Sequence, residues 1–224
     1  MINVLGRKQA VLLAFVILMA VHPLMAGCDE AVFDMPATMG ENPSFDAVGT
    51  QLQNVKVLRA SFKQKKKIKV LRRPLRSSGS FLISAEMGLY WKSVSPFETI
   101  FIITPKALYQ KSENAEPITI QAQERPIIYG FTRVFLSLFS GDTQKLDQEF
   151  DLFFSGTPDN WTIGLIPKSK IMGKLIDRVL VCGADTIRSI DFRESSGDRT
   201  QIIFDEISTD PPHLTEEELA CFDF

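Results

Sequence analysis

Few residues of this sequence have the types and the spacing that catalysis or metal binding requires. The chain contains two histidines, His22 and His213, and three cysteines, Cys28, Cys182 and Cys221. A nucleophile paired with a histidine would depend on His213 alone, and no serine or cysteine motif surrounds it. The cysteines lack the spacing of a zinc site, and no glycine-rich phosphate loop occurs. We therefore expect no metal, no cofactor and no enzymatic activity; carboxylates that converge in a cavity from separate strands are the remaining route to an enzyme.

The residues before Cys28 are compatible with two different cleavage sites. Residues 24–28, LMAGC, approximate a bacterial lipobox, in which cleavage before the cysteine exposes it for lipid attachment. Cleavage after Ala26 would instead leave an ordinary cysteine near the new N-terminus. If Cys28 is lipidated, Cys182 and Cys221 remain as an even pair in an oxidising compartment, which favours a disulfide between them. The alternative for that pair is two separate buried thiols.

A strongly basic stretch runs from Lys63 to Arg76, with eight lysines and arginines and no acidic residue. One interpretation is a solvated hairpin, since charges on a hairpin protect a sheet from edge-to-edge pairing. The other is a docking surface for anionic lipid headgroups or an acidic partner, to which each basic residue adds about 1 kcal/mol. The residues expected to dock are Lys65, Lys66, Lys67, Arg72 and Arg73.

The first 27 residues differ from the rest of the chain. A basic pair at 7–8 precedes an apolar run over 10–21, and small residues follow at 26–27. This pattern is typical of a secretory signal peptide, and the run is too short for a stable membrane-spanning helix. We expect an exported protein, soluble or tethered through Cys28, that is divided into a signal peptide (1–27), a linker (28–43) and a single domain (44–224).

The composition supports one globular domain. The chain is 45% hydrophobic and 23% charged, with a formal net charge of −2. These values are ordinary for a globular protein and argue against general nucleic-acid binding.

Alternation of apolar and polar residues predicts antiparallel strands, beginning in the region 60–104. Leu89 and Trp91 share one face of a strand, and Ile100 and Ile102 share a face of the next strand. Antiparallel sheets permit one apolar and one solvated face. We expect further strands at 107–110, 118–121, 150–154, 161–165, 178–182, 187–193 and 200–207, and therefore a mainly β fold.

Two segments follow a helical period instead. Ser44 is a suitable N-cap for an amphipathic helix whose apolar residues recur at positions 45, 48, 52 and 55. The second helix is expected between Glu124 and Gly141, with Gly141 ending it. Its apolar face contains Ile127, Phe131, Val134, Phe135, Leu138 and Phe139. Short helical turns are expected at 142–149 and after Thr215, where Thr-Glu-Glu-Glu is typical of a capping box. Such a helix on a sheet either encloses a cavity or completes a packed core, and the residues alone favour the packed core.

The order of several short motifs resembles the LolA family, periplasmic carriers that move lipoproteins from the inner to the outer membrane of Gram-negative bacteria. The motifs are Ala-Ser-Phe-x-Gln at 60–64, Leu-Tyr-Trp at 89–91, Trp-x-Ile-x-Leu-x-Pro-Lys at 161–168 and Asp-Thr-Ile at 185–187. A glycine leads the strand between the first two, and a proline follows the second. The resemblance extends from about Ser44 to the C-terminus.

This resemblance implies an incomplete antiparallel β-barrel with a helical lid over a hydrophobic cavity, in place of the packed core. It also implies that the cavity takes acyl chains of a lipoprotein or lipid cargo, and that the carrier works as a monomer between an inner-membrane transporter and an outer-membrane acceptor. The residues that it places in the cavity and lid are Phe45, Val48, Leu52, Leu89, Trp91, Ile100, Ile102, Ile127, Phe131, Val134, Phe135, Leu138 and Phe139.

One departure from the family concerns the control of the lid. Carriers of this family have Arg-Pro at the positions of Ala85 and Glu86, and that arginine latches the lid by hydrogen bonds. Its absence implies a different release control or a different cargo. Two other readings remain, a lipidated acceptor resembling LolB and a carrier or enzyme for another apolar envelope molecule, such as a pigment or a glycolipid precursor.

Overall fold

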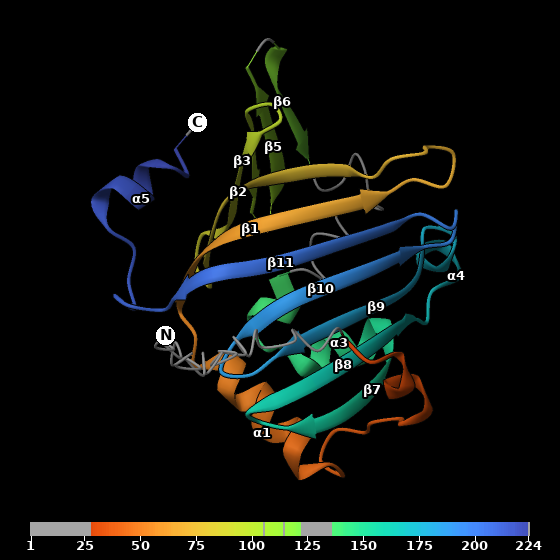
Figure 1. Cartoon of the computed structure of the whole chain (residues 1–224). Coiled ribbons are helices and arrows are strands. Elements are labelled where there is room, and N and C mark those ends of the chain that lie inside the picture. The colour runs from red at the N-terminus through yellow and green to blue at the C-terminus, as the bar shows by residue number, and fades with distance from the viewer. Residues whose placement is uncertain (1–27, 105, 114, 122–135, 224) are drawn as a thin grey trace, which may run out of the picture.

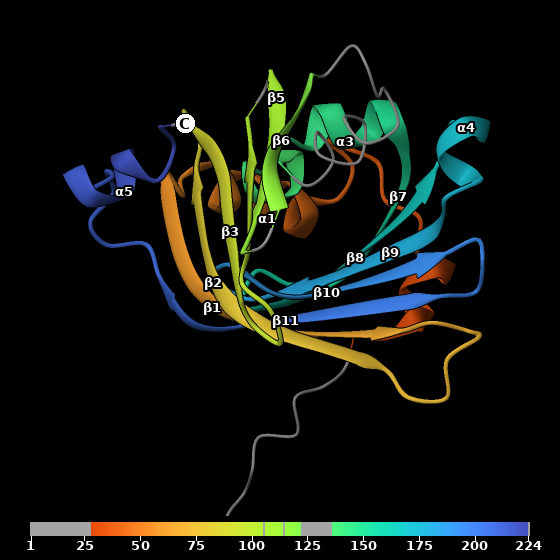
Figure 2. The ribbon, with the colours of Figure 1, turned by 90° about the horizontal axis from the view of Figure 1, so that it is seen from above.

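One antiparallel sheet of 11 strands makes up most of the fold, in the order β6-β5-β4-β3-β2-β1-β11-β10-β9-β8-β7. The computed structural model describes residues 28–104, 106–113, 115–121 and 136–223. The sheet curves strongly but is not closed into a barrel, and β6 and β7 are its two edges (Figures 1 and 2). The expected mainly β fold with an incomplete antiparallel barrel is therefore confirmed. The expected signal peptide lies outside the described residues.

The strands coincide with the segments in which apolar and polar residues alternate, and their ends differ from the expected ones by a few residues. They are β1 (Val57–Lys67), β2 (Leu75–Ser84), β3 (Gly88–Ser95), β4 (Thr99–Ile103), β5 (Ala107–Ser112), β6 (Ala115–Gln121), β7 (Phe150–Thr157), β8 (Asn160–Pro167), β9 (Ile176–Gly183), β10 (Ile187–Glu194) and β11 (Arg199–Ser208).

Gly79, which precedes the apolar part of β2, is required there for steric reasons. The register between β2 and β3 shifts between Ser78 and Gly79. A Cβ atom on Gly79 would lie 1.8 Å from the carbonyl oxygen of Lys92. Only glycine permits so close an approach of the two backbones.

Helices cover the concave face of the sheet. Helix α1 (Pro43–Gln53) and helix α3 (Thr143–Glu149) lie inside the curve of the sheet, as Figure 2 shows. Helix α1 buries Phe45, Val48 and Leu52, and the ring of Phe45 lies 5.4 Å from that of Phe154 on β7. Its N-cap is Asn42, whose side chain accepts a hydrogen bond from the amide of Phe45, so the expected cap at Ser44 is corrected by two residues.

Only residues 136–141 of the expected second lid helix lie within the described part of the chain. Residues 136–139 are helical, and Gly141 follows with a φ of 61°, which ends the helix as expected. The expected lid residues Ile127, Phe131, Val134 and Phe135 lie outside the described residues. No helix in the described ranges has the length and apolar character that crossing a membrane requires.

The start of the N-terminal segment, which we expected to be a linker, lies on the convex face of the sheet. It forms a 3-10 helix, η1 (Glu30–Asp34), which contacts β7 and β8. Val32 is buried there, and Phe33 packs edge-on against Phe153 at 5.4 Å. A Cβ atom on Gly164 would meet the Phe33 ring at 2.8 Å. The absence of a side chain at Gly164 therefore allows this segment to lie close against the sheet.

A disulfide between Cys28 and Cys182 fixes the start of this segment to β9, with 5.7 Å between the two Cα atoms. The expected pairing of Cys182 with Cys221 is therefore wrong, and Cys221 is free. A sulfur atom in a disulfide cannot also form a thioether to lipid. Lipidation of Cys28 and the disulfide thus exclude each other, and the structure has the disulfide.

The C-terminal segment covers the other half of the convex face. After β11 the chain passes Pro211 and forms helix α5 (Glu216–Ala220), with the expected capping box between Thr215 and Glu218. Figure 2 shows α5 outside the sheet, beside β1 to β3. Its neighbour Phe222 belongs to a buried cluster with residues of β1, β2 and β4: Val57, Leu82 and Ile102.

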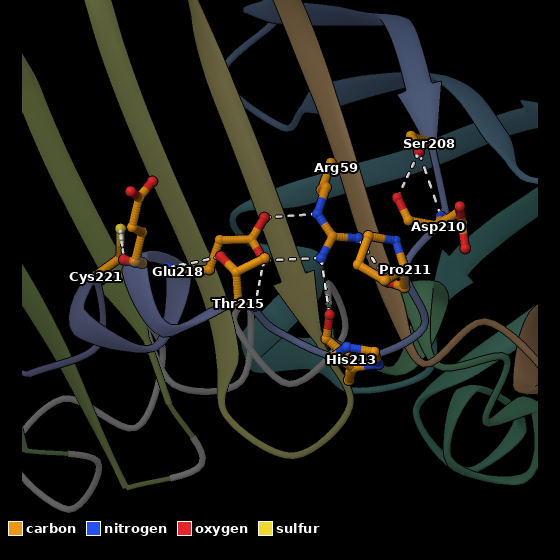
Figure 3. A network of polar contacts seen from close by, with 9 residues as sticks. Arg59, Ser208, Asp210, Pro211, His213, Thr215, Glu218 and Cys221 are labelled. Carbon is orange, nitrogen blue, oxygen red and sulfur yellow. Dashed lines mark hydrogen bonds and ion pairs between the residues drawn. The ribbon is translucent and has the colours of Figure 1, made fainter.

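Arg59 fastens this segment to the sheet. Its guanidinium donates to both carboxylate oxygens of Glu218, at 2.6 and 2.8 Å, and to the carbonyl oxygens of Pro211 and His213, at 2.9 and 3.0 Å (Figure 3). The hydrogen bonds from Arg59 lower the pKa of Glu218 from its usual 4.5 to about 2. The ion pair therefore stabilises the folded chain above about pH 4.5, and this stabilisation is lost as the pH falls toward 2.

We expect Glu218→Gln to lower the free energy of unfolding by about 1–2 kcal/mol at pH 7. The pKa shift alone corresponds to a larger value, but the partly exposed pair is screened by solvent. The loss should shrink between pH 4.5 and 2, because over this range the wild-type carboxyl is protonated in the unfolded chain but still ionised in the folded one, so unfolding takes up a proton. Urea unfolding at pH 7 and pH 3 measures both effects. Glu217→Gln on the same helix is the control and should change neither; equal losses for the two variants would contradict this role of Arg59.

Candidate functional site

The inner face of β3 to β6 carries mostly apolar side chains. Leu89 on β3 belongs to the buried core of the concave side, and Trp91 packs against that core. Residues directly opposite each other on antiparallel strands share a face. The register pairs Leu89 with Ile103 and Trp91 with Phe101. It continues from Ile103 through Leu108 to Ile120, and from Phe101 through the polar Gln110 to Ile118. We call this set the apolar wall: Trp91, Phe101, Ile103, Leu108, Ile118 and Ile120.

The apolar wall is less buried than the core beside it. Most of its side chains are half-buried, and Ile118 is 50% exposed. Core residues on the neighbouring strands, such as Phe62 and Phe81, are at most 2% exposed. The inner face of β3 to β6 thus presents apolar surface that the described helices do not fully cover, and such a surface is suited to an apolar ligand.

A cavity of about 300 Å³ lies between the β2–β3 turn, the segment that joins α1 to β1, and residues 136–145. The cavity lies next to the end of β4 that carries Ile103, because Gly88 lines the cavity and a Cβ on it would lie 2.1 Å from the backbone carbonyl oxygen of Ile103. Cavity and wall together form the candidate site. The cavity lining is apolar at Val55, Ile83, Leu136 and Phe139 and polar at Lys56, Ser84, Ser137, Ser140 and Lys145.

An aromatic cluster forms the floor between the cavity and the rest of the core. The ring of Phe81 lies 4.9 Å from Phe139, 5.0 Å from Phe204 and 5.6 Å from Trp91. Phe62 lies 3.9 Å from Trp91. Phe139 is therefore packed on one side by aromatic rings and borders the cavity on the other. Both alternatives expected for the aromatic helix are therefore present at Phe139, a packed core on one side and a cavity on the other.

The polar groups of the cavity are occupied with local structure. Lys145 forms an ion pair with Asp142 at 2.5 Å. Burial of the Asp142 carboxyl raises its pKa, but hydrogen bonds from Lys145 outweigh this and hold the pKa below its usual value. The hydroxyl of Ser84 accepts hydrogen bonds from the amides of Glu86 and Met87. Within the described ranges no group of three or more His, Cys, Asp or Glu residues is arranged to hold a metal ion. The arrangement is suited to holding an apolar chain.

Most of the described residues that we expected in the cavity and lid lie on the concave side. These are Phe45, Val48, Leu52, Leu89, Leu138 and Phe139 in the buried core, and Trp91 packed against it. Ile102 and Ile100 belong to the convex side instead, where Ile102 is buried with Phe222 and Ile100 packs against that cluster. Their expected position in the site is therefore corrected, and their neighbours Phe101 and Ile103 take it.

The sequence alone gave little signal for this correction. Residues 100–103 of β4 are all apolar, so alternation does not distinguish the two faces. Both faces are apolar because the C-terminal segment covers the outer one. Phe101 and Ile103 lie opposite Trp91 and Leu89 on the neighbouring strand. They could have been identified from these two residues only if the register of the β3–β4 hairpin had been known.

The five expected docking residues do not all face the same way. Lys66 forms an ion pair with Glu194 at 2.8 Å, whereas Lys65, Lys67, Arg72 and Arg73 are exposed. In the described part of the chain, none of these four has an acidic partner within ion-pair distance. They remain available for a partner outside the molecule.

The position at which the resemblance implies a latching arginine in other carriers lies at the cavity. Ala85 is in the β2–β3 turn and lines the cavity, and Glu86 beside it is exposed. Alanine has no side-chain hydrogen-bond donor, so a latch of the family type cannot form from this position.

Comparison with known proteins places these features in a family. A family model described as "Outer membrane lipoprotein carrier protein LolA" matches residues 53–216. An outer-membrane lipoprotein carrier protein of Dechloromonas aromatica is 27% identical over 161 residues, which cover 71% of this chain and 74% of that protein.

Solved structures show weaker similarity. A LolA superfamily protein of Nitrosomonas europaea matches with a TM-score of 0.42 and 7% identity, over 79% of this chain and 97% of that one. LprF of Mycobacterium bovis matches with a TM-score of 0.32 and 10% identity, over 82% of this chain and 99% of that one. Identities and scores this low add nothing about function.

Proposed function

Because the chain belongs to the LolA family of outer membrane lipoprotein carrier proteins, we propose that it binds the acyl chains of a lipoprotein on the apolar wall and in the adjoining cavity, and ferries this cargo across the periplasm. Burial of the chain supplies the affinity, at about 0.8 kcal/mol per methylene. The observation that carries the proposal is the half-buried apolar wall beside a cavity of about 300 Å³.

The size and the chemistry of the site support an acyl ligand. The cavity volume of about 300 Å³ is at the lower end of ordinary ligand sites, roughly 300–1,000 Å³. The wall extends this space along β3 to β6 without introducing a charged side chain. One chain end in the cavity and the remainder along the wall is the arrangement that such a shape favours.

The surroundings of the carrier are part of the same proposal. We infer a periplasmic location, a membrane transporter that loads the cargo and an acceptor that receives it. The Cys28–Cys182 disulfide favours the untethered carrier over the lipidated acceptor, because it uses the sulfur that lipid would need. Mass spectrometry of material retained after gentle purification tests the cargo class, and the absence of any acyl-bearing compound would argue against the proposal.

Adjacent residues on β4 offer a matched test of the wall. Phe101 and Ile100 are both half-buried but face opposite sides of the sheet. We expect Phe101→Ala to weaken binding of a dansyl-labelled fatty acid about 10-fold. An aromatic side chain buried against the ligand contributes at least the binding free energy that this loss of affinity represents. Ile100→Ala should leave the affinity within about 2-fold of the wild type, by the same reasoning. Fluorescence titration measures both; equal effects, or no binding by the unchanged protein, would overturn the proposed site.

A further inference from the structure

Three segments meet at one end of the sheet. They are the β1–β2 loop (68–74), the β10–β11 turn (195–198) and the segment 168–175 with helix α4 (Lys170–Gly173), and we call them the basic rim. The amide of Lys69 donates to Asp198 at 2.9 Å, and Ser195 donates to the carbonyl oxygens of Leu175 and Gly173 at 3.0 and 2.7 Å. Figures 1 and 2 show the three segments along the same edge of the molecule, with the β1–β2 loop projecting from it.

The basic rim exposes aliphatic side chains that no described residue covers. Val70 at the tip of the β1–β2 loop is 87% exposed, and Ile171 on α4 is 65% exposed. Leu71, Leu75 and Leu175 are also exposed large apolar residues. Single exposed leucines are ordinary, but five exposed aliphatic side chains along one edge of the sheet are a concentration of the kind that marks an interaction site.

Basic residues surround these side chains. Along the hairpin Lys65, Lys67, Lys69, Arg72, Arg73 and Arg76 are exposed, and α4 adds Lys170 and Lys174. The acidic residues nearby are already engaged, Glu194 with Lys66 and Asp198 with the amide of Lys69. The rim is therefore positively charged although the chain as a whole has a formal net charge of −2.

We propose that the basic rim binds the surface of an anionic phospholipid bilayer. Val70, Leu71 and Ile171 enter the interfacial region, while the lysines and arginines contact phosphate groups. Aliphatic side chains at a protruding tip with flanking basic residues combine the two contributions that hold proteins on membranes, apolar burial and attraction to anionic lipid. A bilayer can accept so dispersed a set of charges without the fixed pairing geometry that a folded protein partner would need.

This inference rests on the proposed carrier function in one respect, the role of membrane binding, which is to bring the carrier to the membrane where cargo is exchanged. The cavity lies at the β2–β3 turn, at the opposite end of β2 from the basic rim. The rim can therefore bind lipid headgroups while the cavity remains accessible. Vesicle binding needs no cargo, so the two proposals can fail separately.

Flotation of the purified protein with vesicles of phosphatidylcholine alone, or with one third phosphatidylglycerol, tests the inference. One variant replaces Lys65, Lys67, Arg72 and Arg73 with glutamine, and a second replaces Val70 and Leu71 with serine. The matched controls are Lys106→Gln with Lys111→Gln, both exposed on β5 or beside it, and Leu219→Ser on α5. Melting temperature and fatty-acid affinity are measured on every variant.

We expect binding to the anionic vesicles at low salt and none to phosphatidylcholine alone. The four-charge variant should bind at least about 50-fold more weakly, and the wild type should lose most binding in 0.5 M salt. The Val70/Leu71 variant should bind at least about 10-fold more weakly, and the controls should bind like the wild type. No binding to anionic vesicles, or the same binding by rim and control variants, would overturn the inference. If the wild type binds anionic vesicles but does not bind fatty acid, the carrier function is contradicted instead.

Discussion

Replacing Gly141 with alanine should separate the two lid helices and destabilise the protein by about 3 kcal/mol or more. Gly141 follows the second lid helix with a φ of 61°, a conformation that costs an alanine about 1–2 kcal/mol. A Cβ atom there would also lie 2.6 Å from the carbonyl oxygen of Gly49 and 2.7 Å from the amide nitrogen of Gln53, both on α1. Backbone atoms cannot move aside as a flexible side chain can, so the helices themselves must shift.

Gly40 provides the matched control for this substitution. Its φ is 77°, but no atom lies within 4 Å of the position that a Cβ would occupy. Gly40→Ala should therefore cost only the backbone strain, about 1 kcal/mol. Urea unfolding gives both values, and fatty-acid titration reports on the cavity, which Leu136, Ser137, Phe139 and Ser140 line. Similar losses for the two variants would show that the contact between the lid helices contributes little.

The strands and their order along the chain could be predicted because alternation marks them directly. Where only one face of a strand is buried, as at Phe150, Leu152 and Phe154, the apolar residues lie on the core side as expected. The capping box at Thr215 and Glu218 could also be predicted, because it depends on contacts within four residues of the chain. Local chemistry is sufficient for features of this kind.

The features that were missed depend on contacts between distant parts of the chain. Ile100 and Ile102 were assigned to the wrong face because residues on either side of α5, more than 100 residues later in the chain, cover the outer face, which is therefore apolar as well. The partner of Cys182 was wrong because three cysteines allow three pairings, and only the path of the N-terminal segment over β9 decides between them. The cavity likewise results from the way the segment after α1, residues 136–145 and the β2–β3 turn fit together.

Phe139→Ala should lower the free energy of unfolding by about 3 kcal/mol and leave fatty-acid affinity unchanged or higher. Its ring packs on Phe81 and Phe204, at 4.9 and 5.6 Å, and the side chain is only 4% exposed. Truncation therefore removes contacts within the aromatic cluster. Because Phe139 also borders the cavity, the vacated space adds to it rather than forming a separate void. The loss should be at the lower end of the usual 3–5 kcal/mol for a buried phenylalanine for that reason.

The comparison with Phe101→Ala separates the two parts of the site. Phe101→Ala, on the half-buried wall, should lower the affinity for fatty acid with little change in the free energy of unfolding. Phe139→Ala should lower the free energy of unfolding with little change in the affinity. Phe139→Leu keeps most of the apolar volume and should cost about 1 kcal/mol, which provides a folded variant if the alanine variant unfolds. Urea unfolding and fatty-acid titration on all three variants test this opposition. A Phe139→Ala protein that is stable but no longer binds fatty acid would show that the lid holds the acyl chain directly, and the apolar wall would then lose its assigned role.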